Sequence, residues 1–299
     1  NFLMKKINLI YFGSPDFSAK ILYSLCKLKI ENCKFRVAGV VTSPDKPRGR
    51  KQILTPSPVA QTAAKYDLPV FKPTTLDAAN LAHLALLKPD IFLVVSYGKI
   101  IPRSYLDAPA GGSFNIHFSL LPQYRGALPI SEALRNGEVE TGVTLMRLDE
   151  ALDHGPIISQ AKIGIDINDN CQTLTNKLTQ VAIQLLAENL PRLAKNNYAA
   201  VPQNESAATV TPSTKTRTRE NAFVDWEKIK AALNGTGALT IHNLIRSENP
   251  DPGAWTRIGE IEVKIIKTRL DTKYLILDTI QLPGKSVISW QQFTSGHQS

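Results

Sequence analysis

The sequence lacks the motifs of several common enzyme classes. The turn at Gly13 continues as Ser-Pro-Asp, without the G-x-G-x-x-G run whose glycines admit a pyrophosphate, so a nicotinamide enzyme is disfavoured. A GxxxxGK(S/T) phosphate loop is also missing, and ATP or GTP chemistry therefore has no support. The 299 residues include only three cysteines, with no CxxC spacing, which argues against a disulfide framework and against a zinc site.

Long apolar runs are missing as well. No uninterrupted apolar stretch approaches the roughly twenty residues that a membrane-spanning helix needs. The apolar run that follows Lys5 and Lys6 is too short for a secretion signal. We therefore expect a soluble, cytoplasmic protein with reduced cysteines. Because no heptad pattern or repeat is present, we expect a monomer.

Positive charge is concentrated at the start of the sequence. The whole chain carries 35 Lys+Arg against 26 Asp+Glu, a formal net charge of +9, and residues 1–51 alone hold 11 Lys+Arg and 3 Asp+Glu. Such a basic region favours a polyanionic partner such as nucleic acid. A solvated surface without a partner explains the charge equally well.

The first two-thirds of the sequence alternate short apolar strands with helical segments. The unbroken apolar run Ile91–Val95 (IFLVV) is typical of a parallel strand that is covered on both faces. We expect further strands at 7–12, 37–41, 114–117, 142–148 and 157–165, and helices up to residue 28 and at 59–66, 76–87, 130–135 and 173–193. This alternation predicts an α/β fold with a Rossmann-like, doubly wound, mostly parallel sheet.

The pattern changes near residue 200. Residues 204–220 (NESAATVTPSTKTRTRE) contain many Ser, Thr and Ala and almost no large apolar residue, which is typical of a linker. Beyond them, β-like stretches at 260–266 and 274–280 are accompanied by turn sequences. We therefore expect an α/β domain over residues 1–203, a linker over 204–220 and a small, mostly β domain over 221–299.

Two polar side chains end one of the expected strands, in the stretch NIHFSLLPQYRG at residues 115–126. Asn115 and His117 are two positions apart, so their side chains point to the same face of the strand. In an open parallel sheet, active sites lie at the carboxyl ends of the strands. An amide donor beside an imidazole at that place suits the stabilisation of an oxyanion in acyl transfer. A buried histidine with a purely structural role is the alternative.

A second loop carries carboxylates. The stretch GVTLMRLDEALDHG at residues 142–155 runs from a β segment into a turn with Asp149, Glu150 and Asp153. A carboxylate in this loop can orient His117 or accept a proton through water. We interpret Asp149 and Glu150 as ordinary loop charges.

These stretches resemble those of a known enzyme family. NIHFSLLPQYRG is similar to the N-x-H-x-S-L-L-P signature of enzymes that transfer a formyl group from 10-formyltetrahydrofolate, and LDHG resembles the aspartate loop of that family. Further segments resemble the methionyl-tRNA formyltransferases within it, namely FGSPDF, TSPDKPRGRK, SYGKII, ALPI, VDW, NPDPGA and QLPGK. Together these segments cover nearly the whole chain in order.

The resemblance implies roles for particular residues. Asn115, His117 and Asp153 match the catalytic trio of the family, and the second domain matches an OB-like β-barrel that helps to hold tRNA. The loop that contacts the folate corresponds to Ser119, Leu120, Leu121 and Pro122. The tRNA-contacting positions correspond to Lys46, Arg48, Arg50 and Lys51 in a basic loop and to Lys215, Arg217 and Arg219 in the linker. The implied co-substrate is 10-formyltetrahydrofolate, the implied partner is charged initiator tRNA, and no metal is required.

The implied reaction is formyl transfer to the α-amine of methionyl-initiator tRNA, for translation initiation. The amine must be neutral to attack, and a free α-amine titrates at roughly 7.7–8.0. Attack on the formyl carbon builds negative charge on its oxygen. Asn115 and a protonated His117 would stabilise that charge, and losing one such donor costs ~2.7–4 kcal/mol. The sequence leaves open whether His117 or Asp153 takes the proton from the amine.

Some features depart from the family pattern. Phe118, His154 and Pro156 stand where a smaller residue or Pro, a Thr and an acidic residue are usual, and the β domain is shorter than expected. One alternative function is a folate-dependent formyltransferase that acts on an amino sugar or a purine precursor, against which the PDKPRGRK loop counts. Another is a non-catalytic RNA-binding protein with a degenerate enzyme domain, against which the intact trio counts.

Overall fold

The computed structural model describes residues 5–30, 33–49 and 51–296, and its contacts divide the chain into two compact units. Unit 1 comprises residues 1–125, 142–162 and 177–209, and unit 2 comprises residues 126–141, 163–176 and 210–299. The chain therefore passes from one unit to the other several times. The sequence predicts two domains, over residues 1–203 and 221–299, that are joined by a linker at 204–220. This division stays a prediction.

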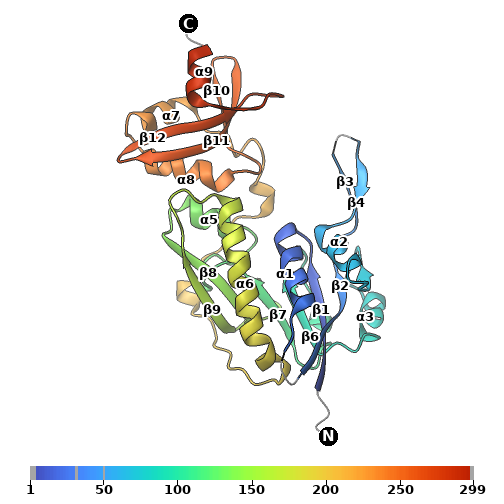
Figure 1. Ribbon diagram of the computed structural model, residues 1–299. Helices are drawn as coiled ribbons and strands as arrows, with labels where there is room; N and C mark the ends of the chain where they lie inside the picture. The colour runs from blue at the N-terminus through green and yellow to red at the C-terminus, as the bar shows by residue number, and fades with distance from the viewer. Residues whose placement is uncertain (1–4, 31–32, 50, 297–299) are drawn as a thin grey trace. The chain divides into compact units, whose positions relative to one another are not determined.

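Unit 1 is built on a mostly parallel sheet (Figure 1), in which the strand order is β5-β2-β1-β6-β7-β8-β9. The strands are β1 (Lys5–Gly13), β2 (Cys33–Val41), β5 (Val70–Phe71), β6 (Ile91–Val95), β7 (Ser113–His117), β8 (Glu140–Arg147) and β9 (Ile157–Gly164). β1, β2, β5, β6 and β7 run parallel, whereas β8 is antiparallel to β7. The strands from β1 to β5 follow one another towards one edge of the sheet. The chain then returns to the other side of β1, where β6 pairs, and continues towards the opposite edge. The Rossmann-like, doubly wound prediction is confirmed.

Helices cover both faces of this sheet (Figure 1). Those of unit 1 are α1 (Asp16–Lys27), α2 (Pro58–Ala64), α3 (Ala78–Ala85), α4 (Arg103–Leu106) and the larger part of α6 (Cys171–Ala194). Successive residues of β1 point to opposite faces. Phe12 packs with Leu84 of α3 and Tyr105 of α4, whereas Tyr11 turns towards α1, where its hydroxyl donates to the carbonyl of Ser18 at 2.8 Å. The two faces are thus buried under different helices, as the unbroken apolar strands predict.

The basic loop of unit 1 is a short hairpin. β3 (Lys46–Arg48) pairs antiparallel with β4 (Ile53–Thr55), and Gly49 takes a positive φ of 68° in the turn between them. Ile53 and Leu54 are 62% and 67% exposed, so the hairpin buries little and presents apolar as well as basic side chains to the solvent. We call residues 46–55 the basic hairpin.

Unit 2 contains an antiparallel sheet, in the order β10-β11-β12-β13, and several helices. The strands are β10 (Trp255–Ile258), β11 (Ile261–Asp271), β12 (Tyr274–Gln281) and β13 (Val287–Ser289), and the helices are α5 (Pro129–Arg135), α7 (Trp226–Leu233), α8 (Ala238–Glu248) and α9 (Trp290–Gly296). Ile229 of α7 and Ile245 of α8 pack with Ile265 and Leu277 of the sheet. A C-terminal antiparallel β domain is confirmed. Over the described residues its strands form an open sheet, in keeping with the shortness of the sequence there.

The segment between these parts is mostly irregular. It contains two 3-10 turns, η1 (Glu205–Ala207) and η2 (Thr214–Thr216). Thr209 at its centre belongs to unit 1, where its backbone N–H donates to the carbonyl of Pro122 at 3.2 Å and its hydroxyl accepts from the N–H of Tyr124 at 2.8 Å. No helix in the described part of the chain is long and apolar enough to span a bilayer.

Candidate active site

The three predicted catalytic side chains meet in unit 1 at the carboxyl end of β7. Asn115 and His117 lie on one face of that strand, and the loop after β8 brings Asp153 to them. The Nδ2 of Asn115 is 3.4 Å from Oδ1 of Asp153, and the Nδ1 of His117 is 3.5 Å from Oδ2. The Asp153 side chain is only 12% exposed, and the other two are buried. The trio is therefore a largely desolvated polar cluster, in which electrostatic interactions are strong.

The orientation of the His117 ring follows from its two neighbours. Nε2 lies 2.8 Å from the carbonyl oxygen of Tyr124, which can only accept, so Nε2 carries a proton. Nδ1 faces the Asp153 carboxylate, which is also an acceptor when it is ionised. The ring is therefore held with Nε2 donating to a backbone carbonyl and Nδ1 turned to a carboxylate.

The loop that carries Asp153 has an unusual backbone. Asp153 takes a positive φ of 48°, a conformation that L-residues other than glycine adopt rarely. Gly155 follows in a crowded place, since a Cβ atom there would lie 1.9 Å from the carbonyl oxygen of Arg147. The LDHG stretch thus needs its glycine for a close approach to the end of β8.

The loop predicted to contact folate is largely folded into unit 1. Ser119 is fully buried, and its hydroxyl donates to the carbonyl of Gln123 at 2.6 Å. The N–H of Leu121 donates to the hydroxyl of Thr144 at 3.1 Å, and its carbonyl accepts from Nε2 of Gln160 at 2.9 Å. Leu120 and Pro122 are half-buried. The contact of these four residues with folate stays a prediction, and their bonds show that the loop has a defined shape.

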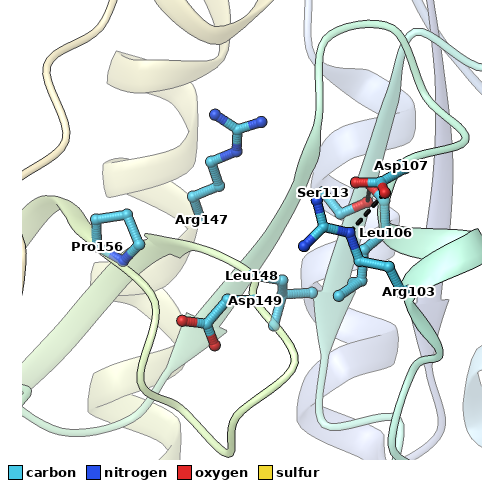
Figure 2. A pocket seen from close by; sticks show the side chains of 8 residues that line it. All are labelled: Arg103, Leu106, Asp107, Ser113, Arg147, Leu148, Asp149 and Pro156. Atoms are coloured by element: carbon cyan, nitrogen blue, oxygen red, sulfur yellow. Dashed lines mark hydrogen bonds and ion pairs between the residues drawn. The ribbon is translucent and has the colours of Figure 1, made fainter.

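A cavity of about 220 Å³ is lined by residues of the strand and the loop that carry the trio, although by none of the trio itself (Figure 2). Its lining includes Ser113, two positions before Asn115 on β7, together with Asp149 and Pro156 from the two ends of the Asp153 loop. The remaining lining residues are Arg103, Leu106, Asp107, Arg147 and Leu148. Pockets for whole ligands measure roughly 300–1,000 Å³. This cavity therefore suits one end of a ligand that extends beyond it.

The residues that depart from the family pattern have defined contacts. The Nδ1 of His154 lies 2.6 Å from Oδ2 of Asp149, and both side chains are partly exposed. Phe118 packs edge-on against Phe17, with ring centroids 5.0 Å apart. Pro156 lines the cavity and offers its carbonyl to the N–H of Arg147 at 3.0 Å.

The basic residues predicted to meet tRNA fall into two groups. Lys46, Arg48 and Lys51 are exposed on the basic hairpin, and Arg50 lies outside the described residues. Lys215 and Arg219 are exposed in unit 2. Arg219 stacks on Trp255, with 4.4 Å between its guanidinium carbon and the ring centroid, and it pairs with Glu262 at 2.5 Å.

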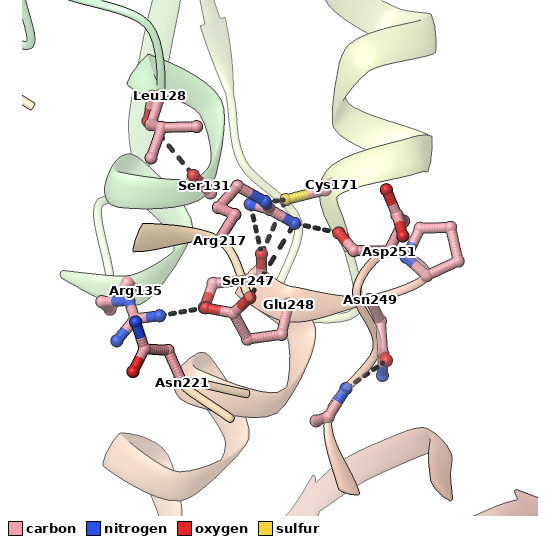
Figure 3. Close-up of polar contacts among 12 residues, drawn as sticks. Leu128, Ser131, Arg135, Cys171, Arg217, Asn221, Ser247, Glu248, Asn249 and Asp251 are labelled. Atoms are coloured by element: carbon pink, nitrogen blue, oxygen red, sulfur yellow. Dashed lines mark hydrogen bonds and ion pairs between the residues drawn. The ribbon is translucent and has the colours of Figure 1, made fainter. Parts of the chain in front are cut away.

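Arg217 differs from the other predicted contacts, because its guanidinium turns into unit 2 (Figure 3). Nη1 donates to the carbonyl of Ser247 at 3.3 Å, and Nη2 donates to the carbonyl of Asp251. Nη2 also lies 3.9 Å from Oε2 of Glu248, a carboxylate that is 4% exposed and also pairs with Arg135. These contacts make Arg217 a structural residue of unit 2, and its contact with tRNA stays a prediction.

Sequence reasoning missed a buried arginine beside the trio. Arg125 is 7% exposed and pairs with Glu205, with 2.9 Å from Nη1 to Oε2 and 2.6 Å from Nη2 to Oε1. This bidentate ion pair lowers the pKa of Glu205 and raises the pKa of Arg125. Arg125 stands in the QYRG part of the signature, but its partner Glu205 lies 80 residues away in the predicted linker. Within the described residues, no cluster of His, Cys, Asp or Glu side chains is arranged to hold a metal ion.

Comparison with known proteins identifies the family. A sequence model described as "Formyl transferase" matches residues 5–190, and one described as "Formyl transferase, C-terminal domain" matches residues 217–274. The chain belongs to the formyl transferase family. It is therefore a formyltransferase enzyme by descent, as the signature at residues 115–122 predicted.

Relatives of this formyltransferase include proteins named methionyl-tRNA formyltransferase. One from Kosmotoga olearia is 36% identical over 97% of this chain and 96% of its own length. Another, from Staphylococcus epidermidis, is 39% identical over 86% of this chain and 78% of its own length. The predicted resemblance to this group of enzymes is confirmed.

Solved structures of sugar-modifying enzymes share the fold of this formyltransferase. WlaRD, a sugar 3N-formyl transferase determined in the presence of dTDP and 5-N-formyl-THF, has a TM-score of 0.64 at 22% identity and covers 92% of this chain and 93% of its own. An N-formyltransferase from Helicobacter canadensis, in complex with folinic acid and dTDP-3-aminofucose, has a TM-score of 0.64 at 23% identity and covers 95% and 98%. At these identities the likeness establishes the fold alone.

Proposed function

We propose that this chain transfers the formyl group of 10-formyltetrahydrofolate to the α-amino group of methionyl-initiator tRNA. The observation that carries the proposal is the meeting of Asn115, His117 and Asp153 in a chain that is 36% identical, over 97% of its length, to a methionyl-tRNA formyltransferase. A formylated folate in the two similar sugar enzymes supports a co-substrate of the same class.

The trio suits attack by an amine on a formyl carbon. The neutral amine forms a C–N bond to that carbon, and the formyl oxygen becomes an oxyanion. Asn115 can donate one of its two Nδ2 N–H groups to it, and His117 can do so once one ring N–H turns from the acceptor that it now faces; losing one such donor costs ~2.7–4 kcal/mol. The intermediate then collapses by breaking the bond to the folate nitrogen. The amine must lose one proton and the folate nitrogen must gain one, and His117 and Asp153 are the two titratable groups of the trio that can carry it.

We assign the folate to the cavity and the loop beside the trio. One end of the molecule enters the 220 Å³ cavity lined by Ser113, Asp149 and Pro156, and the loop from Ser119 to Pro122 contacts the rest. Polar groups of the cavity can bond the amide and amino groups of a pterin ring. No metal takes part in this scheme, because the formyl donor is already activated.

We assign tRNA to the basic hairpin and to the exposed residues Lys215 and Arg219. Arg219, which stacks on the half-exposed ring of Trp255, offers a cation to a phosphate there. Phosphate contacts of these residues position the tRNA, and shape or base contacts must distinguish the initiator. We infer that the enzyme works as a monomer in the cytoplasm, with a catalytic part over residues 1–203 and an OB-like, tRNA-binding part over 221–299.

The test is formyl transfer from 10-formyltetrahydrofolate to charged initiator tRNA, compared with charged elongator methionine tRNA. The expected result is formylation of the initiator, strongly preferred over the elongator, and its loss in His117→Ala at an unchanged melting temperature. Transfer to an amino-sugar nucleotide and to neither tRNA would overturn the proposal, as would full activity of His117→Ala.

A further inference from the structure

The side chain of Gln203 holds the backbone of the Asp153 loop. Its Nε2 donates to the carbonyl oxygen of Asp153 at 2.9 Å and to that of Gly155 at 2.8 Å. Both bonds span about fifty positions of sequence and lie within unit 1. One carboxamide thus uses its two N–H groups on the two residues that flank His154.

The orientation of this carboxamide is set by Arg125. Nε and Nη2 of Arg125 point at Oε1 of Gln203, at 3.0 and 2.9 Å. A guanidinium has only donors, so the oxygen of the amide must face it and the nitrogen must face the loop. Arg125 is itself nearly buried and is held by Glu205, so the amide cannot turn over without placing its NH2 group against two N–H donors of the guanidinium.

The same group of residues also reaches the loop through a side chain. The Nε2 of His154 lies 3.4 Å from Oε1 of Glu205, and its Nδ1 lies 2.6 Å from Asp149 at the start of the loop. Arg125 also directly follows Tyr124, whose carbonyl oxygen pairs with Nε2 of His117. The contacts therefore connect the segment that orients His117 with the segment that carries Asp153.

The conformation of Asp153 is the reason that such support matters. Its positive φ of 48° is uncommon for a non-glycine residue, and such a conformation persists where neighbouring groups over-determine it. Gln203 bonds the carbonyl of that very residue. A shift of about 1 Å in a reacting group can lower a rate roughly 100-fold, so a bond that sets the direction of the Asp153 carboxylate has a direct effect on the reaction.

We propose that Gln203 is a positioning residue for formyl transfer, which holds Asp153 against His117 through its two bonds to the loop backbone and is itself oriented by Arg125. This role rests on the function proposed above. It adds to the trio a residue that touches neither the substrate nor the reacting atoms.

The experiment compares Gln203→Ala and Gln203→Glu with a matched control, Gln184→Ala. Gln184 is exposed on α6, and its Nε2 bonds Glu188 at 3.0 Å, away from the loop. Gln203→Glu keeps an acceptor for Arg125 and removes both donors to the loop. For each variant we would measure kcat and KM, the melting temperature, and amide hydrogen exchange over residues 149–156.

Both Gln203 variants are expected to lower kcat roughly 10- to 100-fold with little change in either KM, and to speed exchange in the loop. The control is expected to match the wild type. In an Asp153→Ala background, Gln203→Ala should have almost no further effect on kcat, because the residue that it positions is gone.

Three results would overturn the role. They are an unchanged kcat, a Gln203→Glu variant as active as the wild type, and a loss that persists undiminished in the Asp153→Ala background. Hydrogen exchange needs no substrate. If the wild type transferred no formyl group to tRNA, the proposed function would fail, whereas exchange at residues 149–156 would still decide whether Gln203 holds the loop.

Discussion

Replacing Asp153 with asparagine removes the charge of the carboxylate and keeps its size. In the structure Oδ1 faces Nδ2 of Asn115 at 3.4 Å and Oδ2 faces Nδ1 of His117 at 3.5 Å. An amide keeps one acceptor and places an NH2 group at the other position, so one of the two neighbours then faces a donor whichever way the amide turns. A hydrogen bond to a charged group contributes about 1.5–3 kcal/mol, which corresponds to a factor of about 10–150 in rate.

We therefore expect Asp153→Asn to lower kcat/KM about 10- to 150-fold, with most of the loss in kcat. The assay is single-turnover formylation of charged initiator tRNA at saturating folate, with quenched samples separated by whether the methionine carries a formyl group. A melting temperature within about 2 °C of the wild type would exclude loss of the fold, because that shift corresponds to only about 1 kcal/mol in a chain of this size. A loss smaller than threefold, or one confined to the KM for tRNA, would refute the assigned role of the carboxylate.

Three further predictions concern the basic hairpin and the interior of unit 2. Changing Lys46 and Arg48 together to alanine should raise the KM for tRNA and flatten its dependence on salt by about 0.7–0.9 logarithmic units per lost phosphate contact, and an unchanged slope across a KCl series would contradict the assignment. Burial lowers the pKa of His242 below its usual 6.5, so the unfolded state binds more protons below that pH. Stability to urea should therefore fall as the pH drops below about 6.5, by at most about 1.4 kcal/mol per pH unit, and His242→Gln should reduce that slope. Glu248→Ala removes a carboxylate that is 4% exposed and paired with arginines, and urea unfolding should show a loss of about 3–5 kcal/mol, whereas a loss below about 1 kcal/mol would show that the pairs contribute little.

The part of the candidate site at the end of β7 could be predicted from the sequence, because it depends only on residues that are close together in the chain. Asn115 and His117 are two positions apart on an apolar strand, and that spacing alone places them on one face. Asp153 was placed beside them through the resemblance of LDHG to a family loop. Its left-handed backbone and the close approach of Gly155 to β8 depend on how the loop crosses the strand, which a sequence pattern does not specify.

Residues that act on the loop from a distance could not be found in this way. Glu205 stands in the polar stretch predicted as a linker and Gln203 directly before it, and their partner Arg125 lies about eighty positions earlier. Arg217 shows the opposite case. The resemblance to the family placed it among the tRNA contacts, whereas in the structure its guanidinium bonds the carbonyls of Ser247 and Asp251. Long side chains such as arginine and glutamine reach in several directions, and only the packed structure decides among them.

Because the two units alternate along the sequence, a C-terminal segment of this chain cannot simply be recombined with the N-terminal part of a relative. In unit 2, His242 and Arg246 of α8 bond the backbone carbonyls of Ile167 and Asp166, at 2.8 and 3.0 Å. The thiol of Cys171 donates to the carbonyl of Ser247 at 2.8 Å. A transplanted segment 210–299 would thus leave behind the acceptors that its own helix requires. Because the acceptors for His242 and Arg246 are main-chain atoms, these two contacts require that the backbone path of residues 166–167 be inherited with α8, whereas the contact of Cys171 also requires its side chain.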